Sequence, residues 1–131
     1  MAVLQVKGVS KSFEQEEIIH QISLELQEGE IVSLLGVSGG GKTTLFNIIA
    51  GLSVPDEGNV TLLGENITGK PGKVSYMLQK DLLMPYKTIV DNVALPLVIQ
   101  GMSKKEAREK AAAYFEEFGL AGTEKKYPAQ L

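Results

Sequence analysis

The stretch Gly36-Val37-Ser38-Gly39-Gly40-Gly41-Lys42-Thr43-Thr44 decides the expected fold of this chain. It fits the pattern G-x-x-x-x-G-K-[ST], in which a glycine-rich turn directs successive backbone N–H groups toward a phosphate. The apolar run at residues 31–35 predicts a buried strand before it, and residues 44–50 predict a helix after it that ends at Gly51. The start of that helix adds a positive end to the turn. We therefore predict a phosphate-binding loop. The alternative, a plain glycine turn between strand and helix, does not require Lys followed by Thr.

The bulk composition indicates one modest domain with a true core. The chain has 131 residues, of which 44% are hydrophobic and 22% charged, which argues against disorder. The net charge of −3, with no basic run longer than a Lys-Lys pair, disfavours a broad nucleic-acid surface. Because there are no cysteines, disulfides, thiolate metal sites and a cysteine nucleophile are excluded.

No targeting or spanning segment is expected. The first residues contain no charged segment that leads into an apolar one, so no secretion signal is predicted. The longest apolar stretch, around residues 93–99, is too short to cross a bilayer and contains Pro96.

Hydrophobic periodicity divides the chain into a strand-rich part and a helical part. Besides residues 31–35, strands are expected at residues 3–7, 18–26, 59–63 and 73–78. Residues 88–99 predict a helix, and Ser103-Lys104-Lys105-Glu106 predicts a capping box that starts another one, ended by Gly119. Its expected apolar stripe consists of Ala107, Ala111, Tyr114, Phe115 and Phe118.

The expected fold class is therefore α/β: a P-loop NTPase-like core with an antiparallel β portion, followed by the start of a helical subdomain. We expect residues 1–87 to form the N-terminal part of the nucleotide-binding core. Residues 88–131 are expected to begin the helical subdomain, so that the domain is incomplete.

Each loop residue has an expected contact with a nucleoside triphosphate. Lys42 is expected to reach the β- and γ-phosphates, and the Thr43 hydroxyl to bind Mg²⁺. Thr44 is expected near the α-phosphate, or is simply a residue that starts the helix. The remaining expected phosphate contacts come from Gly36, Ser38, Gly39, Gly40 and Gly41.

The sequence resembles the nucleotide-binding subunits of ATP-binding cassette (ABC) transporters. The resemblance rests on Val9-Ser10-Lys11-Ser12-Phe13, on the approach to the loop at residues 29–36, and on Tyr76-Met77-Leu78-Gln79. Residues 82–93 continue it, so that it covers essentially all 131 residues. The sequence of this last segment looks closest to those of importers of nitrate, sulfonate or taurine type.

The resemblance implies further site residues and the ligands ATP and Mg²⁺. Phe13 would stack on adenine, with Ile18 as an apolar neighbour of the base. The alternative is that Phe13 is an ordinary core residue of a hairpin. Gln79 would coordinate Mg²⁺ or the attacking water and sense the γ-phosphate.

The resemblance also implies partners. Two ATPase subunits would sandwich two ATP molecules and act on membrane-spanning permease subunits, near residues 82–93. The expected place is the cytoplasm, peripheral at the inner face of the cell membrane, with no nucleic acid bound. The implied function is the N-terminal part of an ATP-binding subunit that couples ATP binding and hydrolysis to import.

Several motifs of the resembled family do not occur in these 131 residues. They are the leucine-serine-glycine-glycine signature, the strand ending in Asp-Glu, and the switch histidine. His20 is expected to be a surface or edge residue. The chain alone is therefore expected to bind ATP without turnover. Three alternatives stay open: a nucleotide-binding fragment without turnover, a non-transport ABC-family ATPase, and a small-molecule kinase, for which Phe13 and Gln79 would be coincidences.

Overall fold

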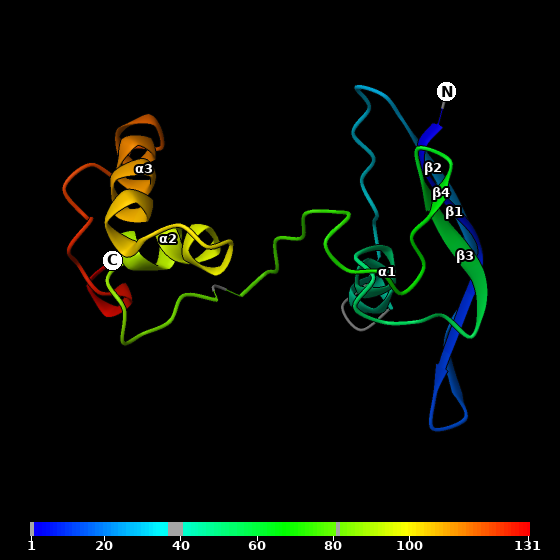
Figure 1. Cartoon of the computed structure of the whole chain (residues 1–131). Coiled ribbons are helices and arrows are strands. Elements are labelled where there is room, and N and C mark those ends of the chain that lie inside the picture. The colour runs from blue at the N-terminus through cyan, green and yellow to red at the C-terminus, as the bar shows by residue number, and fades with distance from the viewer. Residues whose placement is uncertain (1, 37–40, 81) are drawn as a thin grey trace. The chain divides into compact units, whose positions relative to one another are not determined.

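The computed structural model describes residues 2–36, 41–80 and 82–131. It divides into two compact units, Met1–Met77 and Leu78–Leu131. This division falls ten residues before the expected boundary between residues 87 and 88, at the segment that contains Gln79. Figure 1 shows the strands in the first unit and two of the helices in the second.

The first unit is built on an antiparallel sheet of order β2-β1-β3-β4 (Figure 1). Its strands are β1 (Ala2–Phe13), β2 (Glu16–Gln27), β3 (Glu57–Leu62) and β4 (Glu65–Asn66). Val6 lies opposite Leu24 on one side and Val60 on the other, so β1 is the central strand. The expected strands at residues 3–7, 18–26 and 59–63 are confirmed, and β1 and β2 extend further because the hairpin pairs them up to Phe13 and Glu16.

Helix α1 (Lys42–Ile49) lies against this sheet and completes the core, as expected for the helix after the loop. It contributes the buried side chains of Leu45, Ile48 and Ile49. Gly51, with a φ of 81°, follows its end, where a Cβ atom would lie 2.4 Å from the Lys70 carbonyl. The core cluster consists of Leu4, Val6, Val9, Ile19, Leu45, Ile48, Ile49, Val60 and Ile67.

Two expected strands are wrong. Residues 31–35 and 73–78 have no strand assignment, and Ile31 and Leu35 are 94% and 95% exposed. An apolar run indicates that a segment suits burial in a sheet, but a strand exists only where another strand supplies hydrogen-bond partners. In the described part of the first unit, the four strands pair only with one another.

The turn that joins β1 to β2 holds two residues in the left-handed region. Glu14 has a φ of 50° and Gln15 a φ of 68°. Two-residue hairpin loops adopt such conformations because these match the twist of the strands, and Asn-Gly is the favoured sequence. For other L-amino acids the left-handed conformation costs about 1–2 kcal/mol per residue.

Replacing this pair by Asn-Gly (Glu14→Asn with Gln15→Gly) is therefore expected to stabilise the chain by about 1–2 kcal/mol. The gain comes from relieved backbone strain, since both side chains are exposed. Urea unfolding followed by circular dichroism measures it. The reversed pair, Glu14→Gly with Gln15→Asn, is a matched control and should gain less. An unchanged or lower midpoint for the Asn-Gly variant would contradict the strain argument.

The second unit contains α2 (Ile89–Ile99), α3 (Lys104–Glu117) and the short 3-10 helix η1 (Pro128–Gln130). Both expected helices are confirmed. The Thr88 hydroxyl accepts a hydrogen bond from the Asp91 N–H at 3.3 Å, and the Ser103 hydroxyl accepts one from the Glu106 N–H at 3.3 Å. These side chains satisfy N–H groups at the helix starts, which explains where the helices begin. In the described residues, no helix is long and apolar enough to span a bilayer.

Helices α2 and α3 pack through small residues. Ala94 of α2 is buried with Ala107 and Ala111 of α3, so the backbones approach closely. The expected stripe on α3 is confirmed only in part. Phe115 is buried, but Tyr114 and Phe118 are 49% and 70% exposed, because the contact with α2 is narrower than the apolar stripe.

Polar contacts hold the segment before α2. The Asn92 side-chain amide donates to the Met84, Lys87 and Thr88 carbonyls at 3.2, 3.3 and 3.1 Å, and its oxygen accepts from the Met84 N–H at 2.7 Å. One asparagine thus fixes the chain from Met84 to α2.

An ion pair joins the two helices. Arg108 of α3 donates to both carboxylate oxygens of Asp91 in α2 at 2.6 and 3.2 Å, which lowers the pKa of Asp91.

Candidate functional site

Gly41 starts α1 in a conformation that only glycine adopts readily. Its φ is 87°, and its carbonyl accepts the first helical hydrogen bond, from the Leu45 N–H at 3.0 Å. A Cβ atom at this position would lie 2.7 Å from Ile19 Cγ2 and 3.1 Å from the Ile18 carbonyl oxygen. The start of α1 therefore lies directly against β2, and a side chain at residue 41 has no room there.

The N-terminus of α1 is suited to an anion. Among the residues that the structure describes, no side chain caps it, and no acidic residue lies in its first turn. A Ser or Asp cap would accept hydrogen bonds from the same N–H groups that a phosphate needs. The positive end of the helix dipole therefore has no charged competitor within its own first turn.

The Lys42 side chain folds back toward the beginning of the loop. Its Nζ donates a hydrogen bond to the Gly36 carbonyl at 2.5 Å. A Cβ atom at Gly36 would lie 3.7 Å from Lys42 Cδ, an ordinary contact. The ammonium group thus lies next to the stretch expected to surround a phosphate, and Thr43 next to it is exposed.

The structure brings only part of the expected site together. Gly36, Gly41, Lys42, Thr43 and Thr44 lie around the start of α1, with Ile18 of β2 beside Gly41. Ser38, Gly39 and Gly40 lie outside the described residues. Phe13 ends β1 and is 49% exposed, which does not fit an ordinary buried core residue of a hairpin. Gln79 is exposed and belongs to the other compact unit.

Two residues beside Phe13 escaped the sequence reasoning. The Lys11 ammonium lies 5.3 Å from the centroid of the Phe13 ring, and it lies 3.6 Å from Asp56 Oδ1. The Lys-x-Phe spacing was an available signal, because residues two apart on a strand share a face. Asp56 lies 45 residues from Lys11 in the sequence, and no local pattern connects the two. His20 is exposed and lies 3.0 Å from Glu17, as expected for a surface residue.

The donor set fits a phosphate better than a bare metal ion. Backbone N–H groups, the Lys42 ammonium and the Thr43 hydroxyl are complementary to phosphate oxygens. Within the described ranges, no group of three or more His, Cys, Asp or Glu residues could hold a metal ion. Thr43 is exposed at this helix start and offers a single oxygen ligand. A metal ion would therefore need oxygens from the bound phosphates as well.

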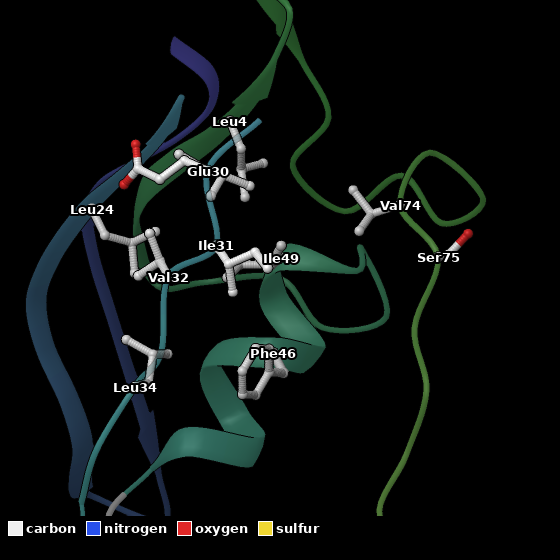
Figure 2. Close-up of a pocket in the computed structure, with 11 residues that line it drawn as sticks. Leu4, Leu24, Glu30, Ile31, Val32, Leu34, Phe46, Ile49, Val74 and Ser75 are labelled. Atoms are coloured by element: carbon white, nitrogen blue, oxygen red, sulfur yellow. The ribbon is translucent and has the colours of Figure 1, made fainter. Parts of the chain in front are cut away.

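An apolar cavity of about 360 Å³ lies on the core side of α1. Figure 2 shows Leu4 and Leu24 of the sheet, Phe46 and Ile49 of α1, and Val74 around it. Residues 30–34 pass along the same cavity. Its described lining is mainly apolar and contains no lysine or arginine, so the cavity does not suit a phosphate.

Comparison with known proteins shows which family the chain resembles. Residues 19–131 match the family model described as ABC transporter. The formylaminopyrimidine import ATP-binding protein ThiZ of Halalkalibacterium halodurans is 47% identical over 114 residues, which are 87% of this chain and 43% of that protein. The taurine import ATP-binding protein TauB of Pseudomonas aeruginosa (strain PAO1) is 39% identical over 135 residues, covering 100% of this chain and 51% of that protein. The chain thus spans about half the length of these curated relatives.

Solved structures of ATP-binding cassettes are similar to this chain as well. The ATP-binding cassette MJ0796, solved as a dimer bound to ADP and Pi, superposes with a TM-score of 0.80 at 29% identity, over 98% of this chain and 62% of that one. A nucleotide-free ATP-binding cassette from an ABC transporter has a TM-score of 0.83 at 22% identity, over 100% of this chain and 59% of that one, which concerns the fold alone. These likenesses confirm the expected α/β fold class with its antiparallel β portion. With the family match over residues 19–131, they lead to one conclusion: the chain belongs to the ABC transporter family.

Proposed function

We propose that the chain is the ATP-binding part of a subunit that powers an ABC importer. The observation that carries this proposal is the start of α1, where Gly41 lies against β2 and no side chain of the described residues caps the helix. Lys42 holds its ammonium group beside this positive end. A chain of this family with such a helix start is suited to the triphosphate of a nucleotide. The import ATP-binding proteins among its relatives support the importer assignment.

Each residue at the helix start has a proposed role. The N–H groups of the loop, Gly36 and Ser38–Gly41 by residue type, surround the phosphates together with the first turn of α1. Lys42 binds the β- and γ-phosphates as a point charge, and Thr44 hydrogen-bonds near the α-phosphate. Thr43 would hold Mg²⁺, which would neutralise part of the charge of the phosphates.

The base and the γ-phosphate have separate proposed partners. Phe13 stacks on adenine, supported by its half-exposed ring at the end of β1, and Ile18 is the apolar neighbour of the base. The Ile18 carbonyl also lies beside Gly41, so β2 links the base side of the site to the phosphate side. Gln79 is proposed to orient the attacking water or bind Mg²⁺.

Activity and assembly are proposals for the whole protein, of which this chain covers about half the length of its relatives. We propose ATP hydrolysis, pairing of two ATPase subunits, and contact with a permease through residues 82–93 at the inner face of the membrane. The 131-residue chain itself is proposed to bind ATP without releasing phosphate. Phosphoryl transfer requires a positioned water and several charge-stabilising groups, and Lys42 and Gln79 supply only part of that set.

Isothermal titration of the chain with ATP in the presence of Mg²⁺ tests the proposal, with inorganic triphosphate as a base-free probe. Phe13→Ala is expected to weaken ATP binding about 5- to 150-fold, since base–aromatic stacking contributes about 1–3 kcal/mol. Triphosphate binding should stay unchanged, and Phe13→Tyr should retain ATP affinity. Phe118→Ala, which removes an exposed ring at the C-terminal end of α3, is the control. Failure of the unmodified chain to bind ATP would reject the proposed function.

A further inference from the structure

The Lys11 ammonium group is held in one place although it lies near the surface. Its Nζ donates to the Val54 carbonyl at 2.8 Å and lies 3.6 Å from Asp56 Oδ1. Only 18% of the Lys11 side chain is exposed. Lysine is rarely covered to this extent unless its charge has partners. The segment 54–56, which precedes β3, therefore determines where this cation lies.

Asp56 ties the end of β1 to the same segment through its backbone and its side chain. Its N–H donates to the Ser10 carbonyl at 2.8 Å, and its Oδ2 accepts from the Ser12 N–H at 2.8 Å. The last ladder pair between β1 and β3 is Ser10 with Glu57. These two bonds therefore prolong the pairing of β1 beyond that ladder. Phe13 follows directly after the part of β1 that they hold.

The held cation covers one face of the Phe13 ring. Lys11 Nζ lies 5.3 Å from the ring centroid, within the roughly 6 Å range of cation–π attraction. The Phe13 residue nevertheless keeps 49% of its surface exposed. Because the ammonium is itself fixed by Val54 and Asp56, the ring is constrained as well, while much of its surface stays open to solvent.

We propose that Lys11 is a positioning residue for the base of the nucleotide. This inference rests on the proposed function, in which Phe13 stacks on adenine. Lys11 covers one face of the ring and keeps the other open, so the base stacks on a single, preset face. A cation attracted to the negative face of an aromatic ring also draws electron density toward itself. The opposite face then becomes a better partner for an electron-rich purine.

The test separates the contribution of the base from that of the phosphates. Lys11→Met keeps most of the side-chain length and removes the charge. It is expected to weaken ATP binding about three- to tenfold and to leave inorganic triphosphate binding unchanged. Lys11→Arg is expected to stay within about twofold of the unmodified chain for ATP, because a guanidinium also stacks on aromatic faces. Lys7→Met removes the same charge from an exposed position of β1 and should change neither affinity.

Each contrary outcome overturns the proposal in a recognisable way. Unchanged ATP affinity in Lys11→Met would show that the cation does not act on the base. An equal loss for ATP and triphosphate would show that Lys11 only stabilises the fold, and so would a loss in Lys11→Arg as large as in Lys11→Met. Should the unmodified chain bind ATP normally in these cases, the proposed function survives and only the role of Lys11 is lost. If the unmodified chain binds ATP no better than triphosphate, Phe13 does not bind the base. The proposed roles of Phe13 and of Lys11 are then both wrong.

A measurement on the free protein guards against variants that fold poorly. In the unmodified chain, the ε-methylene protons of Lys11 should be shifted upfield in NMR spectra by the Phe13 ring, and Phe13→Leu should abolish the shift. Lys11 shifts that are the same with and without the ring would overturn the proposed contact.

Discussion

Replacing Gly41 with alanine is expected to destabilise the first unit by about 2–5 kcal/mol. The left-handed backbone conformation costs an alanine about 1–2 kcal/mol, and forcing a methyl group into a filled site costs about 1–3 kcal/mol more. Both terms apply, since φ is 87° and the new Cβ would lie 2.7 Å from Ile19 Cγ2. The start of α1 would have to move away from β2, so nucleotide binding should weaken at the same time.

Urea unfolding of Gly41→Ala beside Gly8→Ala separates the two causes. Gly8 also has a positive φ, 57°, but a Cβ there would meet no atom within 4 Å. Gly8→Ala should therefore lose only the strain term, about 1–2 kcal/mol. A loss in Gly41→Ala no larger than in Gly8→Ala would show that the contact with Ile19 is unimportant.

Replacing Lys42 with alanine is expected to weaken ATP binding about 10- to 150-fold. A hydrogen bond between charged groups contributes roughly 1.5–3 kcal/mol, and each 1.4 kcal/mol corresponds to a factor of ten. Triphosphate binding should fall by the same factor, because Lys42 is proposed to bind phosphate and not the base. This equal loss distinguishes Lys42 from Phe13 and Lys11, whose variants should affect ATP alone.

The stability of the chain should change little in Lys42→Ala, since its ammonium contacts only the Gly36 carbonyl among the described residues. Lys70→Ala removes an exposed lysine of the same unit and serves as the matched control in the titrations. ATP binding by Lys42→Ala that equals binding by Lys70→Ala would contradict the proposed role. Lys42→Arg should restore only part of the affinity, because a planar guanidinium does not replace a compact ammonium at a crowded phosphate.

Much of the fold could be predicted because its signals are local. The helix after the loop and the helix start at Ser103 each depend on residues within one or two helical turns. The hairpin strands follow from alternation and are confirmed through their pairing. The strands expected at residues 31–35 and 73–78 were wrong, because their apolar pattern reports a preference for burial and carries no information about a ladder partner.

For the candidate site too, some features follow from the sequence and others only from the tertiary structure. The sequence by itself determined the residue types at the start of α1: a glycine that permits the turn, and a lysine and a threonine that suit a phosphate. Only the tertiary structure decided that Ile19 leaves no room for a side chain at Gly41, and that Lys11, held by Val54 and Asp56, lies over the Phe13 ring. Helix starts and loop chemistry depend on neighbours in the chain, which the sequence displays directly. Contacts between β1 and the segment before β3 exist only after the chain has folded, because distant residues meet only then.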